Sequence, residues 1–289
     1  MLHNTLISQT GFAKLVDLPC LQLRFGRASA VISLYGGQVL SYQPQPGNEI
    51  LWLSDKAQWH NNTAIRGGVP VCWPWFGPAV PEINPDNLPL PNHGLVRNRL
   101  WQLTDSKLCD DKLSVTLGIS VTDLPAALWP DGAVARPVNL SLSLTLNNQA
   151  LALQLSCDTA LYQQAALHSY FRINQLSQTR VTGLSHCYFD KVRNAKQASP
   201  SSETSFNGET DRIYYATGKQ LQLTDAESSV IIEQYHHDAS VIWNPWQQKS
   251  RALPDMADQG FTEFVCVETA RLNLKPATGL TLGQTLMPL

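Results

Sequence analysis

Alternating leucines between residues 138 and 156 constrain the fold of this chain more than any other feature of its sequence. Every second residue is a leucine on both sides of an Asn pair: Leu140, Leu142, Leu144 and Leu146 before it, and Leu151, Leu153 and Leu155 after it. Side chains two residues apart point to the same face of a β-strand, so this period places the leucines on one face of each strand. Two such runs around an Asn-rich turn predict a half-buried β-hairpin.

The same alternation recurs elsewhere, whereas no long segment repeats with the period of a helix. Further strand-like runs lie at Ala30–Leu34, Leu113–Val121, Leu221–Leu223 and Val230–Ile232. Only the short segment Ser54–Trp59 favours a helical turn. Many strands separated by Gly, Pro and Asn turns indicate an antiparallel sandwich rather than alternating βαβ units.

We expect residues 1–289 to form a single domain. A chain of 289 residues can be one large all-β domain or two ordinary domains, so length leaves the question open. Two segments break the strand pattern: residues 70–91, rich in proline and aromatics, and the Ser-rich residues 193–210. We interpret the first as an ordered loop and the second as an exposed connection, because strand-like sequence of one style continues on both sides of each.

Composition argues against several classes of protein. Apolar residues make up 43% of the chain and charged residues 15%, which supports a sizeable core and argues against disorder. With a net charge of −2 and no dense Lys/Arg run, the chain has no basic footprint for nucleic acid. The six cysteines show neither CxxC nor zinc-like Cys/His spacing, so we interpret them as reduced thiols. We find no signal-peptide pattern and no window near the roughly 18 apolar residues of a membrane span, and we predict a cytoplasmic location.

Polar residues stand inside otherwise apolar, turn-forming sequence in five short segments. These are Arg66–Pro70 (RGGVP), Pro91–Arg97 (PNHGLVR), Ala166–Phe171 (ALHSYF), Asp211–Tyr214 (DRIY) and Phe264–Glu268 (FVCVE). All five, in this order, resemble the signatures of the aldose 1-epimerase superfamily, and specifically its glucose-6-phosphate 1-epimerase (hexose-6-phosphate mutarotase) branch. Each segment alone is weak, but the ordered set, which includes RGGVPVCWPWFG, is specific and spans most of the chain. The resemblance implies an all-β, galactose mutarotase-like antiparallel β-supersandwich.

His168 and Glu268 are the catalytic residues that the resemblance implies. From the residues alone, a lone histidine such as His168 is more often structural, and Glu268 is as readily a strand-end residue that faces solvent. The matching family positions are the catalytic histidine and the catalytic base. Opening a pyranose ring requires a proton on the ring oxygen and a base for the anomeric hydroxyl, which an imidazole and a carboxylate supply. With the pair on opposite sides of C1, a protonated His168 and an ionised Glu268 predict a bell-shaped pH profile.

Arg66, Arg97 and Asp211 are the first substrate-binding candidates. The guanidinium fork matches phosphate oxygens, and the resemblance implies that Arg66 and Arg97 contact the substrate and its phosphate. The alternative for each arginine is a surface ion pair. Gly67–Gly68 would let the backbone approach a ligand closely, although such a pair is also ordinary turn chemistry. Asp211 matches a substrate-contacting aspartate, and is otherwise a residue of a solvated turn.

Asn92 and His93 complete the predicted site. Asn92 stands where the family can carry glutamine, which keeps the amide but shortens the side chain. We favour a loop-locking role for His93 over proton transfer. Aromatic residues of the neighbouring loop, Trp73, Trp75 and Phe76, suit the apolar face of a sugar, but we favour the interpretation that they fix their own loop against the core.

We therefore predict an isomerase that exchanges the α and β anomers of a hexose 6-phosphate, with glucose 6-phosphate as the expected substrate. No metal or other cofactor is needed for this chemistry. The expected partner is the small sugar phosphate alone, and the protein is expected to be a monomer, with a dimer as the alternative. Three other functions stay open: a mutarotase of unphosphorylated aldoses, a non-catalytic carbohydrate-binding domain, and a glycoside hydrolase, which normally needs two carboxylates.

Overall fold

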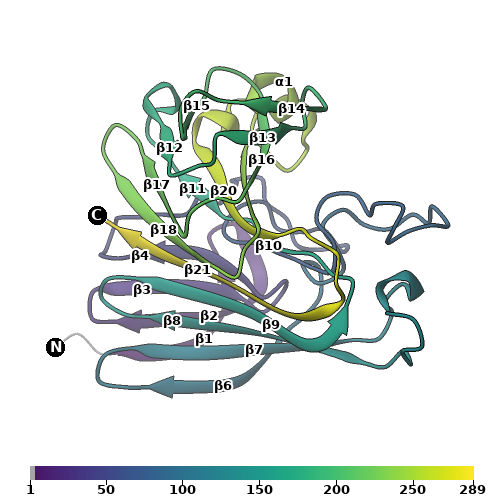
Figure 1. The fold of residues 1–289 in the computed structure, drawn as a ribbon. Helices are drawn as coiled ribbons and strands as arrows, with labels where there is room; N and C mark the ends of the chain where they lie inside the picture. Colours follow the sequence, from purple (N-terminus) through teal and green to yellow (C-terminus); the bar gives the residue numbers. More distant parts are fainter. Residues whose placement is uncertain (1–3) are drawn as a thin grey trace.

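The computed structural model describes residues 4–289, and nearly all of its regular structure is β-strand (Figure 1). A four-stranded sheet has the order β1 (Thr5–Phe12), β2 (Leu15–Phe25), β3 (Ala28–Ser33), β4 (Gln38–Gln43). A nine-stranded sheet has the order β15 (Glu203–Ser205), β12 (Arg180–Thr182), β17 (Gln220–Thr224), β18 (Ser229–Tyr235), β21 (Thr278–Pro288), β9 (Leu151–Leu161), β8 (Val138–Leu146), β7 (Leu113–Val121), β6 (Gln102–Leu108).

An eight-stranded sheet carries the candidate site. Its order is β14 (Ala195–Ala198), β13 (Cys187–Asp190), β16 (Thr210–Tyr215), β19 (Ala239–Asn244), β20 (Phe264–Arg271), β10 (Ala165–Leu167), β5 (Val71–Cys72), and β11 (Tyr170–Arg172) also pairs with β20. The described helices are the α-helix α1 (Trp246–Ala252) and the short 3-10 helices η1 (Ala126–Leu128), η2 (Leu176–Gln178) and η3 (Gly260–Thr262). None of the helices within residues 4–289 has the length and hydropathy that a bilayer crossing requires.

The nine-stranded sheet packs against both other sheets. Its strands β7 and β8 contact β2 and β8 also contacts β3, while its strand β21 contacts β10 and β20. In Figure 1 the purple strands of the four-stranded sheet lie behind the teal strands β7–β9. Isolated bridges from Leu51 to Phe171 and from Val39 to Val69 connect the end of the four-stranded sheet to the eight-stranded one. The paired strands are antiparallel throughout the described sheets, so the predicted antiparallel all-β class is confirmed.

The leucine-rich hairpin is confirmed in detail. Strands β8 and β9 pair with Leu146 opposite Leu151 and Leu144 opposite Leu153, and these leucines are buried. The side chain of Asn147 closes the turn, because its Oδ1 accepts hydrogen bonds from the backbone N–H groups of residues 149 and 150, each at 2.8 Å. The sequence period and the Asn signal therefore determine this element locally.

Three local expectations need correction. Residues 54–59 form one hydrogen-bonded turn, in which the N–H of Ala57 donates to the carbonyl of Ser54, and no helix. Helix α1 was not expected, because seven residues are too few to display a helical period. The segment 193–210 is not merely a connection, since it contributes the short, mostly exposed strands β14 and β15.

The proline-rich loop 70–91 is fixed by its tryptophans, as we favoured. Trp73 and Trp75 are fully buried. The indole N–H of Trp73 donates to Oε1 of Gln163 at 2.6 Å, and that of Trp75 donates to the carbonyl of Pro91 at 2.9 Å. Phe76 is only partly buried, and it lies at the edge of the candidate site.

Candidate active site

One cavity of about 280 Å³ is lined by every residue that the sequence predicted for the site. These residues are Arg66, Asn92, His93, Arg97, His168, Asp211 and Glu268. They come from five segments that lie far apart in the sequence, so the fold alone brings them together. A larger, more apolar groove of about 850 Å³ shares Phe76 and Lys191 with this cavity but is lined by none of the seven.

The register of β16, β19 and β20 explains how this wall of the cavity is built. Asp211 is paired with Trp243, and Val241 is paired with Glu268. Directly paired residues of an antiparallel sheet project to the same face, as do residues two apart along a strand. All four side chains therefore share one face of the eight-stranded sheet. Glu268 lies within β20 rather than at its end, and it is 1% exposed.

His168 lies in the short loop between β10 and β11, which both pair with β20. Leu167 is opposite Thr269 and Tyr170 is opposite Cys266, so the loop places His168 beside Glu268. The imidazole stacks on the ring of Tyr170, with centroids 4.9 Å apart and an interplanar angle of 11°. Its Nε2 lies 3.4 Å from Oε1 of Glu268. The two side chains are thus neighbours in one wall of the cavity, where we expected them on opposite sides of C1.

Burial governs the protonation of this pair. It raises the pKa of Glu268 well above its ordinary value of 4.5, an effect that the charge of Asp211 reinforces and that of Lys191 opposes. Burial lowers the pKa of His168 well below 6.5, and the nearby His93, Arg97 and Arg66 act in the same direction. Burial therefore favours a neutral imidazole and a protonated carboxyl, the reverse of the expected charges. In both arrangements the pair holds one proton.

His93 is tied to the loop 70–91. Its Nδ1 accepts a hydrogen bond from the backbone N–H of Gly77 at 3.2 Å and lies 3.5 Å from Sγ of Cys72. The backbone N–H of His93 donates to the carbonyl of Gly77 at 2.8 Å. Burial and the cations Arg97 and Lys191 lower the pKa of His93 to about 3. The ring is therefore neutral, with its proton on Nε2. These contacts favour the loop-locking role.

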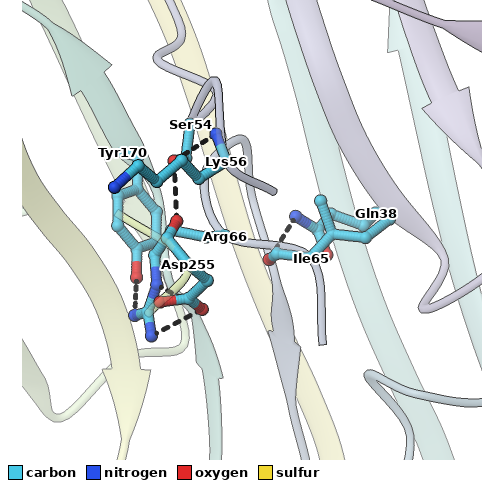
Figure 2. Close-up of polar contacts among 7 residues, drawn as sticks. All are labelled: Gln38, Ser54, Lys56, Ile65, Arg66, Tyr170 and Asp255. Carbon is cyan, nitrogen blue, oxygen red and sulfur yellow. Dashed lines mark hydrogen bonds and ion pairs between the residues drawn. The ribbon is translucent and has the colours of Figure 1, made fainter. Parts of the chain in front are cut away.

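The guanidinium of Arg66 is already paired. Figure 2 shows it between the carboxylate of Asp255 and the hydroxyl of Tyr170. Its Nε and one terminal nitrogen each lie 3.0 Å from Oδ2 of Asp255, and the other terminal nitrogen donates to Tyr170 Oη at 3.0 Å. Both contacts raise the pKa of Arg66. Asp255 offsets the charge of Arg66, so Arg66 offers the cavity N–H donors more than net positive charge.

The glycines beside Arg66 lie where backbone segments cross closely. Gly68 has a φ of +61°, and a Cβ placed on it would lie 2.0 Å from the carbonyl oxygen of Val39. A Cβ on Gly67 would lie 2.5 Å from the carbonyl oxygen of Trp52. These glycines let backbone segments approach each other, and neither lines the cavity, so their approach to a ligand stays a prediction.

Three further cations line the cavity: Arg97, Lys191 and Lys249. Within residues 4–289, Arg97 forms no ion pair with a carboxylate. Lys191 Nζ lies 3.4 Å from Oδ2 of Asp211 and 5.7 Å from the ring centroid of Phe76. Lys249, on α1, is bound to Glu209 at 3.1 Å, and both of these side chains are partly exposed. The cavity wall therefore carries an excess of positive charge.

Asp211 and Asn92 lie at different depths of this wall. Asp211 is on strand β16 and not in a solvated turn, and burial raises its pKa although Lys191 opposes the shift. Asn92 is exposed, on the loop that also carries His93. The sequence did not identify Lys191, Lys249, Trp243 or Asp255, because their segments contain no recognisable motif. Only the folded structure reveals them: β19 pairs with β16 and β20 and carries Trp243, β13 pairs with β16 and is followed by Lys191, and α1 and the loop after it carry Lys249 and Asp255.

The chain is similar in sequence to known proteins over most of its length. The sequence profile of the family described as "Aldose 1-epimerase" matches residues 19–285. An Escherichia coli (strain K12) protein named "putative glucose-6-phosphate 1-epimerase" is 32% identical over 260 residues, covering 89% of this chain and 84% of that one.

Solved structures show the same architecture. A Salmonella typhimurium protein described as a "putative mutarotase" superposes with a TM-score of 0.84 at 28% identity, covering 99% of this chain and 96% of that one. Galactose 1-epimerase from Lactobacillus acidophilus has the same fold at 12% identity, with a TM-score of 0.71 over 100% of this chain and 99% of that one. The predicted galactose mutarotase-like fold is confirmed, and the chain belongs to the aldose 1-epimerase family.

Proposed function

We propose that this protein interconverts the α and β anomers of a hexose 6-phosphate, with glucose 6-phosphate as the expected substrate and His168 and Glu268 as the acid–base pair. One observation carries the proposal: Nε2 of His168 lies 3.4 Å from Oε1 of Glu268 at the base of a cavity whose wall holds several cations. The relatives' names support the same reaction, since the Escherichia coli protein and a Haemophilus influenzae protein at 33% identity are both named for glucose 6-phosphate.

The spacing of the pair suits the reacting atoms. The anomeric hydroxyl and the ring oxygen are both bonded to C1, so two groups in contact with one another can reach both oxygens from one side. One group must give a proton to the ring oxygen while the other removes the proton of the hydroxyl. A pair that holds a single proton contains one donor and one acceptor, whichever residue carries that proton. Ring opening therefore does not depend on a charged pair.

The second half of the reaction restores the enzyme. After ring opening the proton has moved from the donor to the acceptor, and the aldehyde is free to rotate about its C1–C2 bond. On reclosure the ring-oxygen hydroxyl returns its proton, and the other residue protonates the carbonyl oxygen. The opposite anomer forms, the protons balance, and the pair regains its first state.

The residues best suited to bind the phosphate are Arg97, Lys191 and Lys249. Charge-assisted contacts to phosphate are the strongest available to the site, and these three cations line one cavity. Arg66 is less suited to the dianion, since Asp255 and Tyr170 already bind all three nitrogens of its guanidinium. Lys191 and Lys249 each form one ion pair, which leaves further N–H donors on each ammonium group. We assign Arg66 to the sugar hydroxyls, together with Asp211, and the phosphate to the other cations.

NMR exchange spectroscopy on glucose 6-phosphate tests the proposal. We expect cross-peaks between the anomers to grow far above the spontaneous rate, with weaker catalysis of glucose and galactose. Lys191→Met should raise KM for glucose 6-phosphate and leave KM for glucose much less affected. Equal efficiency on all three sugars would support a general aldose mutarotase instead, and no exchange on any of them would contradict the proposal.

A further inference from the structure

Three side chains at the base of the cavity offer three different metal-ligand atoms. The sulfur of Cys266, a ring nitrogen of His168 and a carboxylate oxygen of Glu268 all lie within 4.8 Å of one another, and all three residues are buried. Cys266 and Glu268 are two residues apart on β20, so their side chains share a face. The pairing of Tyr170 with Cys266 brings the loop of His168 to them. The spacing of these residues in the sequence gave no sign of this cluster.

The geometry is close to that of a tetrahedral zinc site. Bonds of about 2.0–2.1 Å from Zn²⁺ to nitrogen and oxygen place two such ligands about 3.3–3.4 Å apart. Nε2 of His168 and Oε1 of Glu268 are already 3.4 Å apart. A Zn–S bond of about 2.3 Å requires the sulfur to lie about 3.5 Å from each of the other ligands. The flexible Glu268 side chain and the Cys266 rotamer need only about 1 Å of adjustment to reach that arrangement.

Two polar atoms of the cluster are available. Nδ1 of His168 and Oε2 of Glu268 are buried and have no hydrogen-bond partner anywhere in the described part of the chain. Buried polar atoms are nearly always paired in folded proteins, so these two are exceptions. The ion itself would bind the other two atoms, Nε2 and Oε1, which lie 3.4 Å apart.

We propose that His168, Cys266 and Glu268 form an inhibitory site for thiophilic dications such as Zn²⁺ and Cd²⁺. The ion takes one nitrogen, one sulfur and one oxygen ligand, and its fourth position faces the cavity. Soft and borderline cations suit this donor set, whereas Mg²⁺ and Ca²⁺ prefer oxygen ligands alone. Occupation removes both members of the acid–base pair from catalysis. Inhibition therefore rests on the proposed function, but metal binding does not.

Co²⁺ titration of the whole protein tests binding without reference to activity. We expect one equivalent to produce a thiolate-to-cobalt charge-transfer band in the near ultraviolet, and Zn²⁺ to displace it. Cys266→Ala should abolish the band, whereas Cys20→Ala, which removes an equally buried sulfur from β2 of the four-stranded sheet, should retain it. Should Cys266→Ala fail to fold, Cys266→Ser provides the same comparison. A band of equal strength without the Cys266 sulfur, or no band in the wild type, overturns the proposal.

Inhibition is measured in parallel by NMR exchange. Zn²⁺ should inhibit the wild type in competition with glucose 6-phosphate, and Mg²⁺ at the same concentration should not. Loss of a supporting group typically weakens metal binding by 10–100-fold, so Cys266→Ala should need at least about tenfold more Zn²⁺. Equal inhibition of both proteins contradicts the proposal. A cobalt band in a protein without anomerase activity would refute the proposed function and leave the metal site intact.

Discussion

At the scale of single residues, the proposed acid–base pair His168–Glu268 is distinguished by its burial. Both side chains are nearly inaccessible, and burial disfavours the charged form of each. Such a pair costs stability, and proteins retain costly buried groups mainly where function requires them. This cost makes the pair testable in two independent ways, through turnover and through stability.

Turnover should depend on both members of the pair. We expect His168→Ala or Glu268→Gln to lower kcat by about 10²–10⁴, the usual contribution of a positioned acid or base. NMR exchange measures the rate, and circular dichroism checks that each variant is folded. Wild-type turnover in both variants would show that the acid–base assignment is wrong.

Glu268→Gln, which should lower turnover, should raise the stability of the protein at neutral pH. The folded-state pKa of Glu268 lies well above its ordinary value of 4.5, so the unfolded chain releases this proton first as pH rises. Its contribution to stability is therefore present below pH 4.5 and is lost as pH rises toward the folded-state pKa. Glu268→Gln removes that loss, so its melting temperature should exceed that of the wild type at pH 7.5, with little difference near pH 4.5. A variant less stable than the wild type at pH 7.5 would contradict the raised pKa.

Asp255 should position Arg66 without taking part in proton transfer. Asp255→Asn removes the charge that holds the guanidinium, and a charged hydrogen bond of this kind contributes about 1.5–3 kcal/mol. We expect a higher KM, a smaller change in kcat and an unchanged pH profile. Asp258→Asn, at an exposed position three residues along the same loop, is the matched control. A changed pH profile in Asp255→Asn would show that Asp255 belongs to the proton-transfer machinery.

Sequence reasoning named seven residues that line the cavity, but it missed other lining residues and the partners of the seven. Motif resemblance sufficed for His168 and Glu268, because each lies in a short recognisable segment. The partner of Arg66 is 189 residues away, on a loop with no motif, so its pairing was not predictable. The neutral state of the pair was also missed, because the degree of burial is a property of the folded sheets.

At the scale of elements, local patterns predicted the strands that have one buried face. Strand β7 begins and ends at the expected residues 113 and 121, and the β8–β9 hairpin has the expected turn. Prediction failed for elements that are very short and for elements that form only through tertiary contacts. The strands β5, β10 and β11 contain two or three residues each, yet β10 and β11 determine where His168 lies. Strands β10 and β11 depend on pairing with β20, and β5 depends on pairing with β10.

Close backbone crossing beside Arg66 should make Gly68 irreplaceable. A left-handed conformation costs an alanine about 1–2 kcal/mol, and Gly132→Ala, at a φ of +76° with open space around it, should show only this loss. Gly68→Ala adds a backbone clash with Val39, so we expect a larger loss of unfolding free energy and a lower kcat/KM through displacement of Arg66. Chemical denaturation compares the two variants. Equal losses would show that the chain at Gly68 moves aside freely.

At the scale of the whole molecule, the path of the chain connects the sheets. After β9 in the nine-stranded sheet, the chain enters the eight-stranded sheet at β10, returns at β12, crosses again at β13, and continues to alternate until β21. The largest buried apolar cluster draws on all three sheets, for example through Leu23, Leu153 and Val267. Length alone left one or two domains open, whereas this path favours one.

We therefore propose that residues 1–289 unfold as one domain. Because the chain alternates between the two large sheets, neither sheet can lose its strands without disrupting the other. Intermediates with one intact sheet should therefore be scarcely populated. Calorimetry should give a van't Hoff enthalpy equal to the calorimetric enthalpy, and tryptophan fluorescence should change at the same denaturant concentration as circular dichroism. Two separated transitions would show that a part of the chain folds independently. The proposed acid–base pair bears on the same point. Glu268 lies on β20, and His168 lies in the loop between β10 and β11, which both pair with β20, so turnover should be lost within that single transition.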